Sequence, residues 1–132
     1  MDIQSRADIE LLLNTFYEKV RKEDTIGFIF NDIAKVNWEH HIPIICDFWE
    51  TLLLGASSYT KNAMQVHYSL NRIVTLEEKH FQRWLQLFSE TVDDLFGGNM
   101  AMQAKTKARS IASLMQFKMN QENKGLNLTE NR

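Results

Sequence analysis

Apolar residues recur at helical spacing along most of this 132-residue chain. Between residues 9 and 20 they fall at intervals of three and four, which places them on one face of an amphipathic helix. The same spacing returns three more times, so we predict main helices near residues 6–22, 38–54, 75–96 and 100–120. Five glycines and one proline are too few for the many turns of an all-β fold. The sequence therefore predicts an all-α protein.

Capping signals indicate where these helices begin and end. Ser5 lies three residues before Asp8 and predicts an N-cap for the first helix. The run TLEE at residues 75–78 is a capping-box pattern for the third helix, and Gly55 predicts the end of the second. We expect Asn99 to cap the last helix. Residues 121–132 are polar, so we expect one domain over residues 1–120 and a disordered tail.

Composition excludes several classes of protein. A net charge of −2 gives no basic footprint for nucleic acid, so we expect no nucleic-acid partner. Apolar runs are too short for a membrane span, and the N-terminus does not have the pattern of a signal peptide. Cys46, the single cysteine, cannot form an intramolecular disulfide and is typical of a buried apolar residue. We therefore expect a cytoplasmic protein without membrane contact.

Two histidines fall on apolar faces of different predicted helices. His41 shares a face with Ile45, whereas the adjacent His40 is rotated toward solvent, and His67 lies in a short apolar stripe after an irregular segment. A zinc site needs four ligands, and no cysteines, histidines or carboxylates occur at zinc spacings. Two inward histidines with aromatic walls are instead compatible with a haem held by one axial imidazole. Both histidines could equally be structural residues of a core.

Several segments together decide between these alternatives. They are FYEKVRKEDTIGFIF, NWEHHIP, DFWETLLLG, a tyrosine and a histidine in the segment that follows, HFQRWLQLFSETVDDLFGG and IASLMQ. In order and at compatible spacing, they resemble a truncated haemoglobin of group III over roughly residues 8–119. This resemblance implies a shortened globin, a two-over-two helical sandwich around haem b.

The resemblance also implies roles for individual residues. His67 corresponds to the proximal histidine that binds the iron, and Tyr17, Trp84 and His41 correspond to polar residues on the distal side. His41 could donate a hydrogen bond to the ligand, gate its entry or bind the iron, and we favour a gate or a weak donor. The remaining expected haem contacts are Phe30, Ile45, Phe88 and Met115.

Such a pocket predicts tight binding of dioxygen, with NO and CO as further ligands. Tyr17 and Trp84 each offer one hydrogen-bond donor to a ligand that carries partial negative charge. Tight binding suits detoxification of nitric oxide or peroxidase-like chemistry better than oxygen delivery, and either reaction needs an external reductase. Two alternatives remain at this point: a haem-free helical interaction module and a haem-based gas sensor.

Overall fold

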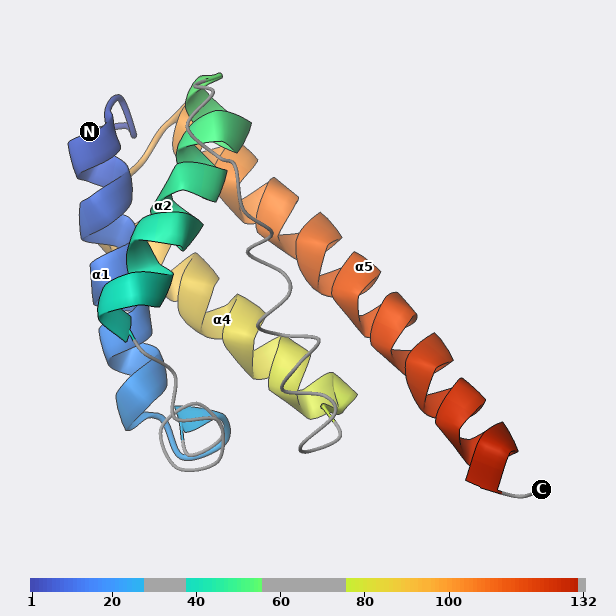
Figure 1. Cartoon of the computed structure of the whole chain (residues 1–132). Helices are drawn as coiled ribbons and strands as arrows, with labels where there is room; N and C mark the ends of the chain where they lie inside the picture. The colour runs from blue at the N-terminus through green and yellow to red at the C-terminus, as the bar shows by residue number, and fades with distance from the viewer. Residues whose placement is uncertain (28–37, 56–75, 131–132) are drawn as a thin grey trace.

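The computed structural model describes residues 1–27, 38–55 and 76–130, without the side chains of residues 119 and 122–130 (Figure 1). All regular secondary structure in these ranges is helical. The helices are α1 (Arg6–Lys22), α2 (Trp38–Leu54), α4 (Glu78–Leu95) and α5 (Asn99–Glu130). The predicted all-α fold is therefore confirmed.

The helices pack as two pairs. Helix α1 contacts α2, and α4 contacts α5, while α1 also packs on α4 and so joins the two pairs (Figure 1). Each helix contributes one apolar face to a shared core, as the spacing of the sequence predicts. Two helices above two helices is the predicted sandwich.

Charged side chains fix α1 against its neighbours. The Arg6 guanidinium lies 2.6 Å from a carboxylate oxygen of Asp47 and 3.1 Å from one of Glu50, both on α2. Just after α1, the Glu23 carboxylate lies 2.8 Å from Arg83 of α4 and accepts the backbone N–H of Ile26. These contacts hold the ends of α1 at a set distance from α2 and from α4.

The predicted ends of α1 and α2 are confirmed. The Ser5 hydroxyl accepts a hydrogen bond from the backbone N–H of Asp8, as an N-cap does. Helix α2 ends at Leu54, and Gly55 follows with a φ of +74°, a left-handed conformation that glycine adopts without strain. Pro43 lies inside α2 rather than in its first turn, so it removes one N–H from the helical ladder.

The predicted start of α4 is wrong. The helix begins at Glu78, with Glu77 as its N-cap, and Thr75 lies outside the described residues. The backbone N–H of Glu77 donates to Nδ1 of His80 at 2.8 Å, so this imidazole takes the place of the acidic partner that the TLEE pattern suggests. A histidine as the third residue of a helix is a rarer partner than glutamate, and the pattern alone gives no reason to choose it.

The predicted start of α5 near residue 100 is confirmed, but the predicted cap and the predicted end are wrong. Asn99 is the first residue of α5, and the carboxylate of Asp2 accepts the N–H groups of Met100 and Ala101 at 2.9 Å each. The cap therefore comes from the other end of the chain. At its far end α5 continues to Glu130, beyond the predicted limit near residue 120, and extends past the other helices (Figure 1).

Candidate functional site

Three polar side chains from three helices are buried at the centre of the molecule. Tyr17 of α1, His41 of α2 and Trp84 of α4 are 1%, 4% and 7% exposed. The rings of Tyr17 and His41 have centroids 6.0 Å apart at 74°. We call these three residues the polar cluster. They are the three residues for which the sequence suggests a distal role.

Aromatic rings form the wall around this cluster. Trp84 stacks on Phe88 with ring centroids 5.7 Å apart and 13° between the planes. Phe88 in turn stacks on Trp49 of α2 at 4.9 Å, and Phe16 meets Trp84 edge to face at 5.7 Å. Stacked and edge-to-face pairs stabilise the positions of the rings more than the burial of their apolar area alone. The polar cluster is therefore held by rigid neighbours rather than by loops.

Two nitrogen atoms of the polar cluster are buried without a hydrogen-bond partner among the described residues. They are Nε2 of His41 and Nε1 of Trp84. Each such atom costs about 1–3 kcal/mol of folding free energy unless something pairs with it. Unpaired buried polar atoms are rare in folded proteins and call for an explanation. Here they mark a place where a small polar ligand would find hydrogen-bonding groups already in position.

Burial keeps the polar cluster uncharged. It lowers the pKa of His41 to about 4, and the charge of the neighbouring His40 acts in the same direction. It raises the pKa of the Tyr17 hydroxyl well above the usual value, against the opposite effect of the Trp84 indole. The indole is thus near enough to affect the hydroxyl, although its N–H makes no hydrogen bond to any described residue. At neutral pH the cluster offers a neutral imidazole, a phenol and an indole.

The other residues suggested by the sequence divide into two groups. Ile45, Phe88 and Met115 are 5%, 0% and 2% exposed, on α2, α4 and α5. Ile45 follows His41 by one helical turn, and Phe88 is part of the aromatic wall. His67 and Phe30 lie outside the described residues, so the proposed iron ligand and the proposed stacking phenylalanine stay predictions.

Sequence reasoning missed part of α2. The spacing of His41, Ile45, Phe48 and Leu52 predicts the buried face of α2, but Phe48 and Leu52 are only partly buried. The buried face is rotated toward Cys46, Trp49 and Leu53, which lie beside His41 and Ile45 around the helix. Cys46 is buried as expected, and burial raises the pKa of its thiol to about 11.

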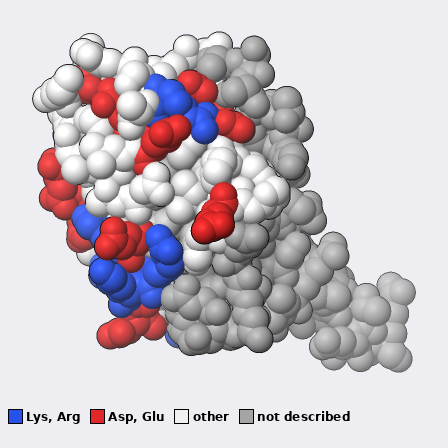
Figure 2. Space-filling view, turned by 60° about the vertical axis from the view of Figure 1, so that its left-hand side comes forward, with Lys and Arg blue, Asp and Glu red and all other residues white. Residues whose placement is uncertain are grey.

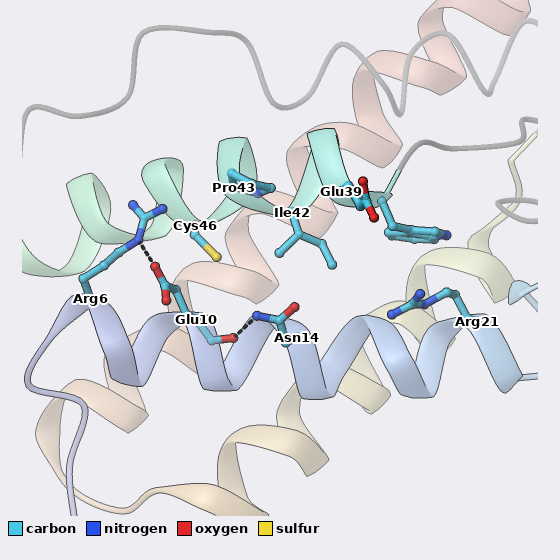
Figure 3. Close-up of a pocket in the computed structure, with 9 residues that line it drawn as sticks. Arg6, Glu10, Asn14, Arg21, Glu39, Ile42, Pro43 and Cys46 are labelled. Atoms are coloured by element: carbon cyan, nitrogen blue, oxygen red, sulfur yellow. Dashed lines mark hydrogen bonds and ion pairs between the residues drawn. The ribbon is translucent and has the colours of Figure 1, made fainter.

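A surface cavity of about 480 Å³ lies between α1 and α2 (Figure 3). It is close to the polar cluster through Trp38. Trp38 separates the two, because it lines the cavity and its ring contacts those of Tyr17 at 5.1 Å and His41 at 6.0 Å. The Arg21 guanidinium covers the Trp38 ring at 5.2 Å from its centroid. The cavity has mixed charge, and the unpaired nitrogen atoms do not line it. The residues that line it are Arg6, Glu10, Asn14, Arg21, Trp38, Glu39, Ile42, Pro43 and Cys46.

Comparison with known proteins places this geometry in a family. The chain is 31% identical over 115 residues to a group 3 truncated haemoglobin of Campylobacter jejuni, across 85% of this chain and 88% of that protein. The chain belongs to the group III truncated haemoglobins. The crystal structure of a group III truncated haemoglobin from the same organism covers 90% of this chain and 95% of its own, with a TM-score of 0.75 and 30% identity. No protein-family model matches the chain.

Membership of the group III truncated haemoglobins implies a haem group and a small gas ligand. The polar cluster fits such a ligand, because two of its buried nitrogen atoms have no partner in the part of the chain that the structure describes and aromatic rings lie against them. None of the helices in residues 1–27, 38–55 and 76–130 is long and apolar enough to cross a membrane.

Proposed function

We propose that the chain is a haem b protein in which His67 binds the iron and the polar cluster contacts a diatomic ligand. When bound, haem supplies a ferrous iron that takes up dioxygen, NO or CO and can exchange electrons. The observation that carries the proposal is the pair of unpaired nitrogen atoms on His41 and Trp84. Family membership supports the same assignment.

The side chains of the polar cluster favour a ligand with partial negative charge. The indole N–H of Trp84 and the hydroxyl of Tyr17 are donors, while the neutral His41 can donate from one nitrogen atom only. Because all three side chains are buried, water competes poorly for these donors. Dioxygen polarised by the iron is such a ligand, so we expect it to be held tightly and released slowly.

Slow release favours chemistry over delivery, so we propose oxidation of nitric oxide to nitrate. Nitric oxide and dioxygen together take up one electron to become nitrate, and an external reductase must replace that electron. Peroxidase-like chemistry is the second candidate, because the same donors could polarise an O–O bond. The polar cluster would hold the ligand in either case. The two reactions differ in the partner that must enter the pocket.

Rapid mixing tests the proposed reaction. The reduced protein is equilibrated with air, mixed with nitric oxide and analysed for nitrate and for the oxidation state of the iron. We expect one nitrate for each haem, formed within the mixing time, together with complete oxidation of the iron. If the iron is oxidised but no nitrate forms, and the protein turns over hydrogen peroxide rapidly, peroxidase-like chemistry is the function instead.

A further inference from the structure

Charge is divided unevenly along the chain. Residues 1–98 carry nine basic and fifteen acidic side chains, a net charge of −6, whereas residues 99–132 carry six basic and two acidic ones, a net charge of +4. Between Asn99 and Gln121 there are four basic residues and no acidic one. Elsewhere the charges are mixed: on the face where α1 comes forward, basic and acidic side chains lie together (Figure 2). Helix α5 is therefore a basic element on an acidic body.

The basic residues of α5 accompany exposed apolar ones. Leu114 and Phe117 are 46% and 59% exposed, although their neighbour Met115 is buried. Lys107, Leu114 and Lys118 are spaced by seven and four, which places them on one side of the helix. The exposed Met102 and the half-buried Lys107 also line a hollow of about 490 Å³ along the first turns of α5. We call Met102, Lys107, Leu114, Phe117 and Lys118 the outer face of α5.

Within the described side chains, which do not include that of Glu122, the lysines of this face have no acidic partner. Lys105, on the side toward α4, lies 2.7 Å from a carboxylate oxygen of Asp93. Among the described residues no carboxylate lies within ion-pair distance of Lys107 or Lys118. A charge that is not compensated within its own molecule acts at longer range and can steer an oppositely charged partner. The partner that fits is therefore acidic.

We propose that the outer face of α5 is the docking surface for an acidic electron-donor protein. The inference rests on the proposed function, in which each nitrate formed requires one electron from outside the globin domain. Electron-transfer complexes are small and transient, and charge complementarity sets their rate of association. Exposed Leu114 and Phe117 between two lysines form such a patch, an apolar centre with a basic rim. Beneath it lies Met115, one of the side chains expected to contact the haem.

A second copy of this chain fits the face poorly. In a symmetric dimer the same face of each copy meets across a twofold axis, so a face that carries Lys107 and Lys118 would lie against another face of the same positive charge. Like charges at such short distances disfavour association. The positive charge of this face thus favours a partner of the opposite sign over a copy of the same surface.

The test measures how fast a reduced plant-type ferredoxin, a small acidic iron–sulfur protein, reduces the ferric haem-loaded chain. At about 10 mM salt, where the Debye length is about 30 Å, Lys107→Glu/Lys118→Glu should slow the bimolecular reduction about tenfold or more. High salt should remove most of this difference. Lys22→Glu/Lys79→Glu is the matched control, because it makes the same change in net charge at exposed lysines outside α5. The control should stay within about twofold of the wild type.

Equal slowing of the reduction in both double variants would mean that only net charge matters, and it would overturn the proposal. Reduction at the wild-type rate in both variants would overturn it as well. Dithionite, a small donor that needs no docking, should reduce all three proteins at similar rates, which controls for an altered haem pocket.

A second readout does not depend on haem. Oxidised ferredoxin should protect Lys107 and Lys118 of the wild-type chain from acetylation while leaving Lys22 and Lys79 reactive. Failure of the proposed function would appear as absent haem uptake, whereas failure of this inference would appear as absent protection. If vesicles of phosphatidylglycerol and phosphatidylcholine protect the two lysines and ferredoxin does not, the face binds anionic lipid and the proposal is wrong.

Discussion

Trp84 combines two properties that are rarely found together. Its ring is part of the aromatic wall, stacked on Phe88 and edge to face with Phe16, so its position is fixed by packing. Its indole nitrogen is nevertheless buried without a partner among the described residues. Packing alone would be satisfied by phenylalanine, which has no such atom to bury. At the scale of single residues, this unpaired N–H supports the proposed contact of Trp84 with a ligand.

Replacing this one donor gives a direct test of that explanation. We expect Trp84→Phe to retain the fold and the haem but to raise the dissociation rate of dioxygen about ten- to hundredfold. A hydrogen bond to a charged or strongly polarised partner contributes about 1.5–3 kcal/mol, and about 1.4 kcal/mol corresponds to a factor of ten. Stopped-flow replacement of dioxygen by CO measures the rate.

Trp49→Phe is the matched control for this measurement. Trp49 is also buried and stacked on Phe88, but its nitrogen is not among the unpaired atoms. Its replacement should leave the rate nearly unchanged. Equal rates in Trp84→Phe and in the wild type would remove Trp84 from the proposed ligand contacts.

At the scale of helices, a residue near the N-terminus of the chain, Asp2, caps the helix that begins near residue 100. The carboxylate of Asp2 accepts the N–H groups of Met100 and Ala101 and so caps α5. Gly98 has a φ of +131°, and a Cβ atom there would lie 2.7 Å from the Asp2 side chain. The chain can approach this closely because residue 98 is glycine. The position of α5 relative to α4 thus depends on a residue 98 positions away.

The stability that this cap gives to the fold depends on pH, and the direction of the dependence follows from its hydrogen bonds. Backbone hydrogen bonds, above all that from Met100, lower the pKa of Asp2 below its ordinary value of 3.8. The carboxylate therefore stabilises the fold above that pH, and the contribution is lost as the pH falls through the lowered pKa. We expect Asp2→Asn to lower the melting temperature by a few degrees at neutral pH and the difference to shrink at strongly acidic pH.

Asp93→Asn is the matched control for thermal unfolding followed by circular dichroism. It removes an exposed carboxylate that pairs with Lys105, and exposed pairs contribute little. A melting temperature that is the same for Asp2→Asn and Asp93→Asn at neutral pH would show that the cap does not stabilise α5.

At the scale of the whole molecule, the two helix pairs pack against each other and surround a buried site. Contacts of α1 with α2, of α4 with α5, and of α1 with α4 bring Tyr17, His41 and Trp84 together from distant parts of the sequence. The aromatic wall and the ion pairs of Arg6 and Glu23 hold this arrangement. The same architecture leaves the basic α5 on the outside, where a partner can reach it.

Helical periodicity predicted the four main helices, because each has one clear apolar face. It could not predict features that arise from tertiary contacts. Asp2 gives no sign in the sequence that it caps a helix near residue 100, and His80 replaces the expected acidic residue at the start of α4. For the candidate site, the resemblance to truncated haemoglobins suggested Tyr17, His41 and Trp84. The two nitrogen atoms without partners became visible only from the packing.

The central claim is that the chain holds haem through His67, and the visible spectrum tests it most directly. The purified protein would be recorded as the ferric form, after reduction and with CO, beside His67→Ala and, as a control for an exposed histidine, His40→Ala. We expect a Soret band that shifts with CO in the wild type and in His40→Ala but is weakened or lost in His67→Ala. No Soret band after addition of hemin, or an unchanged one in His67→Ala, would contradict the claim.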